Sequence, residues 1–234
     1  GNSIESGGNY NVVVGDEAGT AITTGDNNVA IGYAALDANT TGTANTAVGG
    51  SALGANVSGA SNTAVGYNSM AVNTAANNSA FGRSSLLVNT SGTANTAIGT
   101  DTLVANTTAS NNTAVGFSAL NANTTGARNT GIGDTALAAN TTGDNNVAVG
   151  RGTLDANTTA DANTAVGQAT LGANTTGASN TAVGRAALLA NTTGTENVAV
   201  GALALDANTT ASYNTAVGFD TLSANVLGSR NVAI

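Results

Sequence analysis

The sequence repeats one short block along almost its whole length of 234 residues. Each copy carries a marker glycine, and successive markers lie 17 residues apart, with one exception of 16 residues. The markers are Gly15, Gly32, Gly49, Gly66, Gly82, Gly99, Gly116, Gly133, Gly150, Gly167, Gly184, Gly201 and Gly218. Because a unit this short cannot bury a core alone, it has to stack on its neighbours, and the period therefore predicts a solenoid.

The residues within each unit indicate β-structure. The block Asn-Thr-Ala-Val-Gly is followed by a leucine four residues after the glycine, and then by Ala-Asn-Thr-Thr-Gly or a close variant. A period of 17 is not a heptad multiple, and recurring Gly and Asn disfavour long helices. We predict an all-β fold, a parallel β-solenoid of about fourteen 17-residue coils with two short strands per coil, Thr-Ala-Val and Ala-Leu-x-Ala.

We expect a single continuous array over residues 1–234. Residues 1–27 form an atypical first unit or a boundary, because Gly19 replaces the leucine and Ile22 the asparagine that precedes Thr-Thr-Gly; residues 28–234 are regular. The 16-residue step has its lost residue between Asn73 and Asn78. We place that loss in a turn, because loops tolerate deletion while strand registers do not.

Two columns of residues are expected to hold the coils together. The asparagines before Thr-Thr-Gly are expected to stack as an amide ladder in which each side chain bonds to the next coil. This ladder comprises Asn39, Asn56, Asn73, Asn89, Asn106, Asn123, Asn140, Asn157, Asn174, Asn191, Asn208 and Asn225. The Val/Ile and Leu columns are expected to point into the coil, with the core represented by Val48, Leu53, Val65, Met70, Phe81, Leu86, Ile98, Leu103, Val115 and Leu120.

The composition argues against an enzyme. His, Cys and Lys are absent, so the usual zinc, haem and iron–sulfur ligand sets and most general bases are missing. We therefore expect no catalytic residue, no metal and no cofactor. Two carboxylates at variable positions, such as Asp37, Asp155 and Asp206, could form the catalytic pair of a glycosidase. We favour the interpretation that they are exposed surface charges.

The charge and hydropathy patterns exclude two classes of partner. A net charge of −8 with only five arginines provides no basic face for a nucleic acid. No apolar run approaches the roughly 20 residues that span a bilayer, so we expect no membrane insertion.

A second copy of the chain is the expected partner. In an extended Thr-Ala-Val segment, Thr46 and Val48 share one face while Ala47 takes the other, and both faces are small or apolar. A strand with one wet face would alternate apolar and polar residues. We therefore predict a homo-oligomer in which small-residue faces meet, against the alternative of a monomeric solenoid.

The repeated Asn-Thr/Val-Ala-Val/Ile-Gly block, followed by a second small-residue segment, resembles the head repeats of YadA-like trimeric autotransporter adhesins and similar arrays in phage tail fibres. That resemblance covers essentially the whole chain and implies a left-handed β-roll assembled as a trimer. The family's repeats are usually shorter, near fourteen residues, and the longer second half here changes the cross-section.

Other interpretations of the repeat remain open. The Asn-Thr-Thr sequons could carry glycans unless their asparagines form the ladder. The turns Gly25–Asn28 and Gly143–Asn146 resemble calcium-binding turns, although most units lack the Asp that a calcium β-roll repeats. Ranks of threonine, such as Thr40 and Thr41 and their copies, could order water in an ice-binding solenoid.

The sequence as a whole predicts a non-enzymatic extracellular fibre segment at a cell surface or on a virion, a rigid rod of an adhesin or a phage tail fibre. Exposed residues of the variable turns would supply weak repeated contacts to a host-surface receptor or glycan, and we name Arg83, Arg128, Arg151, Arg185, Phe117 and Tyr213. The alternative is a filament subunit that stacks end to end.

Overall fold

The computed structural model describes residues 8–234, which form two compact units, residues 8–112 and 113–234. Residues 8–112 contain strands β1 (Val12–Val14), β2 (Val29–Ile31), β3 (Thr46–Val48), β4 (Thr63–Val65), β5 (Ser79–Phe81) and β6 (Thr96–Ile98). The second unit contains β7 (Thr113–Val115), β8 (Thr130–Ile132), β9 (Val147–Val149), β10 (Thr164–Val166), β11 (Thr181–Val183), β12 (Val198–Val200), β13 (Thr215–Val217) and β14 (Val232–Ala233).

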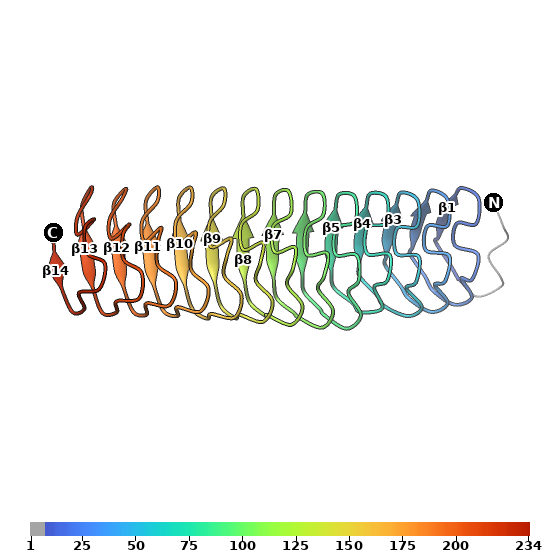
Figure 1. Ribbon diagram of the computed structural model, residues 1–234. Helices are drawn as coiled ribbons and strands as arrows, with labels where there is room; N and C mark the ends of the chain where they lie inside the picture. Colours follow the sequence, from blue (N-terminus) through green and yellow to red (C-terminus); the bar gives the residue numbers. More distant parts are fainter. Residues whose placement is uncertain (1–7) are drawn as a thin grey trace. The chain divides into compact units, whose positions relative to one another are not determined.

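Each unit is a parallel β-solenoid, as the repeat predicts. Within a unit, each strand pairs in parallel with the strand of the next coil, and equivalent residues of the repeat face each other, as Ala47 does Ala64 and Ala165 does Ala182. Figure 1 shows one strand per coil, following one another in chain order within each unit. The part of the chain that the structure describes contains no helix, and hence no helix long and apolar enough to cross a membrane.

The prediction of two strands per coil is wrong. The Ala-Leu-x-Ala segment is a series of turns, because its leucines adopt left-handed backbone conformations, with φ of 54° at Leu36 and 52° at Leu53. The segment still bonds to its neighbour, since the Leu36 amide donates to the Ala52 carbonyl at 3.0 Å. A left-handed leucine costs about 1–2 kcal/mol, and complete burial of its side chain, worth about 1.5–3 kcal/mol, offsets that cost.

The leucine column forms the core together with the alanine at the centre of most strands; β1 has Val13 and β8 has Gly131 at that position. Leu53, Met70, Leu86, Leu103 and Leu120 are fully buried, which confirms these core predictions. The central alanines, such as Ala47, are equally buried. The inside of a coil is narrow, so the strand turns its smallest residue inward, opposite the leucine.

The predicted core position of the Val/Ile column is therefore wrong. Alternate residues of a strand point to opposite sides, so an inward alanine forces both flanking residues outward. Phe81 and Ile98 are each 41% exposed. Val48, Val65 and Val115 are half-buried on the same outward side.

The marker glycine lies at the corner that follows each strand, where φ is positive and the backbone of the next coil comes close. At Gly49, φ is +131°, and a Cβ atom there would lie 2.6 Å from the carbonyl oxygen of Gly66 in the next coil. A side chain at this position would thus clash with the neighbouring coil as well as strain the backbone. This explains why the marker is glycine in every unit.

Candidate functional site

The predicted asparagine ladder is present within each unit. The Asn56 side-chain amide donates to Oδ1 of Asn39 at 3.2 Å and to the Gly59 carbonyl of its own coil at 3.0 Å. The same pair of bonds recurs along the column, for example from Asn174 to Asn157 and to Gly177. All ladder asparagines except Asn225 are fully buried, so this column ties each turn to its own coil and to the neighbouring coil.

A second ladder runs through the asparagines that open each Asn-Thr-Ala-Val-Gly block. Oδ1 of Asn45 accepts both the backbone amide of Asn62, at 3.0 Å, and its side-chain amide, at 3.2 Å. The Asn62 amide also reaches the Ala75 carbonyl at 2.8 Å. The sequence shows this column, but its bonds become evident only once the coils are stacked.

The 16-residue coil interrupts the first ladder without disturbing the strands. Thr63 still pairs with Ser79, so the strand register is kept. Asn73, however, donates to the Ala75 carbonyl at 2.9 Å and not to Asn56, whose Oδ1 is buried without a hydrogen-bond partner. Since Ala75 accepts the bond that Gly59 accepts one coil earlier, the missing residue lies between Asn73 and Ala75.

Burial of the ladder bears directly on the sequons. A glycan on Asn140 would replace the hydrogen of an amide that already donates to Asn123 and to Gly143 in the interior. The folded coil therefore leaves no room for N-linked modification at the buried sequon asparagines.

The threonines of the same turns divide into two ranks. The Thr40 hydroxyl donates to the Val57 carbonyl of the next coil at 3.2 Å, and copies such as Thr141 do the same. Thr41 and its copies lie exposed beside them. Only the second rank presents its hydroxyls outward, and an ice-binding role for it remains a prediction that thermal hysteresis would test.

Aspartates in the turn before the Asn-Thr-Ala-Val-Gly block accept hydrogen bonds from the backbone of the preceding coil. Oδ1 of Asp144 accepts the Ala127 amide at 2.7 Å, and Oδ1 of Asp161 accepts the Asp144 amide at 2.7 Å. Over residues 8–234, no group of three His, Cys, Asp or Glu side chains is placed to hold a metal ion. Arg83, Arg128, Arg151, Arg185, Phe117 and Tyr213 all lie exposed, as expected.

The outward side of the strands is the first candidate functional surface. The first strand residue is Thr, Val or Ser and the third is Val, Ile or Phe, and the in-register pairing aligns each kind in a column along each unit. No strand of residues 8–234 carries a charged residue. We call this surface the Thr/Val face.

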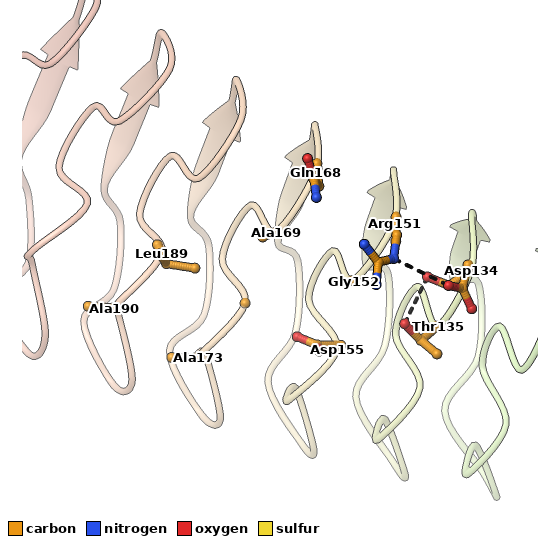
Figure 2. Close-up of a pocket in the computed structure, with 11 residues that line it drawn as sticks. Asp134, Thr135, Arg151, Gly152, Asp155, Gln168, Ala169, Ala173, Leu189 and Ala190 are labelled. Carbon is orange, nitrogen blue, oxygen red and sulfur yellow. Dashed lines mark hydrogen bonds and ion pairs between the residues drawn. The ribbon is translucent and has the colours of Figure 1, made fainter.

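A groove in the second unit is the second candidate (Figure 2). It has a volume of about 620 Å³ and is lined by Asp134, Thr135, Arg151, Gly152, Asp155, Gln168, Ala169, Gly172, Ala173, Leu189 and Ala190. Arg151 on one rim is held by Asp134, with Nε 3.4 Å from Oδ2. Gly152 and Gly172 add no side chain to this lining, although the same repeat positions hold larger residues in neighbouring coils, Thr135 and Leu189.

Asp155 is the most unusual side chain in this groove. Burial raises the pKa of its carboxyl above the ordinary value, although the backbone amides of residues 155 and 156 oppose that rise. Asp37 stands at the same position of its repeat in the first unit, and burial raises its pKa as well. In the first unit, a hydrogen bond to Glu17 also raises the pKa of the Tyr33 hydroxyl.

Comparison with family models, curated proteins and solved structures found no match for the chain. The resemblance to trimeric autotransporter heads and phage fibres thus stays a prediction that rests on the repeated motif.

Proposed function

We propose that the chain is a rigid, non-enzymatic segment of an extracellular fibre, of the kind that supports a cell-surface adhesin or a phage tail fibre. The observation that carries this proposal is the double asparagine ladder, which adds side-chain bonds to the backbone bonds between successive coils. Because these bonds run along the direction of stacking, bending or stretching a unit would break several of them together. Such a design suits a load-bearing spacer.

Copies of the chain would assemble through the Thr/Val face. An apolar column of Val, Ile and Phe beside small uncharged residues is a composition expected at the centre of a protein interface, where charged residues are depleted. Since the face repeats once per coil, a rotation axis parallel to the stacking direction would bring every coil against its equivalent in the next copy. The trimer implied by the family resemblance is the assembly we favour.

Light scattering on the purified chain tests the assembly. We expect the mass of an oligomer, a trimer in the favoured case, and conversion to monomer by Val48→Asp, which places a charge on the Thr/Val face. Thr41→Asp, which adds the same charge to an exposed turn, is the matched control and should keep the oligomer. A compact wild-type monomer would refute assembly, and an open-ended mass distribution would favour the end-to-end filament.

The groove beside Asp155 would supply the adhesive contact. Its lining offers the Asp155 carboxylate and the Gln168 amide together with small residues, which suits the hydroxyls and C–H face of a sugar ring. Its volume falls in the range of about 300–1,000 Å³ usual for small-ligand sites. Weak binding here would gain strength when several copies engage one glycan-covered surface.

Filling the groove tests this contact. In Gly172→Leu, the new Cβ would lie 3.3 Å from Leu189 Cδ1 and 3.6 Å from Asp155 Oδ1, and leucine already occupies the same repeat position at Leu189. We expect saturable binding of at least one neutral oligosaccharide in saturation-transfer NMR, weakened about tenfold or more by this variant. Ser223→Leu, at the same repeat position, should bind as the wild type does. Equal binding by both variants would exclude the groove.

A further inference from the structure

Near-identical coils create a problem of alignment for the assembly proposed above, on which this inference rests. If one copy slides along its partner by one coil, every remaining coil meets a surface almost like its proper one. Weakly specified registers of this kind slip unless some feature penalises the alternatives.

Strand β5 differs from every other strand of residues 8–234 at both outward positions of the Thr/Val face. Among the fourteen strands of residues 8–234, only β5 has serine at the first position and only β5 has phenylalanine at the third. Both side chains lie on the outward side, because Ala80 between them is fully buried. The smallest first residue and the largest third residue thus occur together in one strand.

The small Ser79 and the large Phe81 have complementary sizes at a contact between neighbouring copies. Around a three-fold axis, the contact between neighbours is heterologous, so the third-position column of one copy can face the first-position column of the next. A phenylalanine ring needs more space than valine or isoleucine, and serine leaves more space than threonine or valine. Aligned copies would seat each Phe81 beside a Ser79, while a slipped pair would press Phe81 against a larger residue and leave a void at Ser79.

We propose that Ser79 and Phe81 form a register key, which aligns β5 of each copy with β5 of its neighbour. The exposed ring of Phe81, 41% accessible in the single chain, is the side chain that the neighbouring copy would cover. Bulky aromatic anchors seated in complementary pockets commonly dominate the energetics of interfaces. The key thus determines alignment, whereas the Val/Ile column supplies most of the contact.

Moving the key tests the proposal. The variant Thr46→Ser/Val48→Phe/Ser79→Thr/Phe81→Val transfers the pair from β5 to β3, two coils away in the same unit. It should form homo-oligomers of wild-type mass. When it is unfolded and refolded with differently tagged wild type, native mass spectrometry should show mixed oligomers about tenfold below the statistical proportion. Two tagged wild-type chains, the control, should mix statistically.

Cross-linking provides a second measurement that does not depend on the transposed variant, because the chain has no cysteine of its own. Chains with Thr63→Cys are mixed either with Val65→Cys chains, which report alignment, or with Ile31→Cys chains, which report a slip of two coils. Adding Ser79→Thr/Phe81→Val to both partners should raise the ratio of slipped to aligned disulfides about tenfold.

The outcomes separate the two proposals. Statistical mixing of the transposed variant with wild type, or an unchanged cross-linking ratio, would overturn the key while leaving the oligomer intact. A monomeric wild-type chain would overturn the assembly itself and the key with it.

Discussion

At the scale of single residues, the chain places each kind of side chain where its size and polarity fit the coil. Leucine tolerates a left-handed backbone because the interior accepts its side chain completely, and alanine turns inward because nothing larger fits opposite that leucine. Asparagine is used where a buried turn needs one donor group and one acceptor on a short side chain. The buried polar groups of these turns find their hydrogen-bond partners in the asparagine side chains.

Loss of one ladder amide should destabilise the fold. Asn157→Ala removes the acceptor for Asn174 and leaves that region of the interior with unpaired polar atoms. We expect a loss of about 1–3 kcal/mol in the free energy of unfolding, measured by urea denaturation. Thr159→Ala abolishes the same sequon at an exposed residue and should change stability by less than about 0.5 kcal/mol. Equal losses would contradict a role for the ladder.

The raised pKa of Asp155 predicts a pH dependence. Because burial raises this pKa in the folded state, the folded chain holds the proton more tightly than the unfolded chain, so ionisation of Asp155 destabilises the fold as pH rises through the folded pKa. Asp155→Asn should therefore have a higher Tm than wild type at neutral pH. That advantage should shrink as pH falls toward the ordinary carboxyl value of 3.8. A Tm difference that is independent of pH would argue against this cause.

At the scale of the elements, strand register and turn length are separable. The short coil keeps Thr63 opposite Ser79 although it lacks a residue, because the backbone absorbs the loss in the turn after Asn73. The consequence falls on the ladder, where Oδ1 of Asn56 has no partner. A periodic structure can thus tolerate an aperiodic coil at the expense of one buried hydrogen bond.

Restoring the missing residue should stabilise this coil. Insertion of threonine between Thr74 and Ala75 recreates the Asn-Thr-Thr turn of the regular units and allows Asn73 to donate to Asn56. We expect a gain of about 1–3 kcal/mol, seen as a higher Tm. The matched control inserts threonine between Thr124 and Thr125 of a regular coil and should lower the Tm. A loss of stability from the first insertion would show that the short turn is optimal as it stands.

At the scale of the whole molecule, stability comes from repetition and owes little to charge. Arg83 forms an ion pair with Asp101 and Arg151 forms one with Asp134, and both arginines are exposed. Exposed pairs contribute about 0–1 kcal/mol each. Hydrogen bonds and apolar burial repeated from coil to coil therefore carry the fold of each unit.

Salt should accordingly change thermal stability very little. Raising NaCl from about 0.05 M to about 1 M screens the two ion pairs and also the self-repulsion of a chain with a net charge of −8. These effects oppose each other, so we expect the Tm measured by circular dichroism to move by less than about 3 °C. A fall of about 10 °C or more would mean that ion pairs matter far more than their exposure suggests.

The sequence by itself determined the period, the parallel stacking, the leucine core and the asparagine ladder. Those features follow from recurrence, because identical units stack only when each residue meets its own copy, and the marker glycine and asparagine are the residues that close turns require. The 16-residue step could likewise be assigned to a turn, since a deletion within a strand would have reversed its two faces.

Only the tertiary structure decided which side of the strand faces inward and how the leucine segment runs. In Thr-Ala-Val both sides are small or apolar, so the alternation that normally distinguishes core from surface is missing, and the inner width of the coil selects alanine over valine. The left-handed leucines were equally hidden, because local propensity favours an extended segment there and the gain from burial appears only when the coil closes. That choice leaves the valines and Phe81 on the outside, where another copy can meet them.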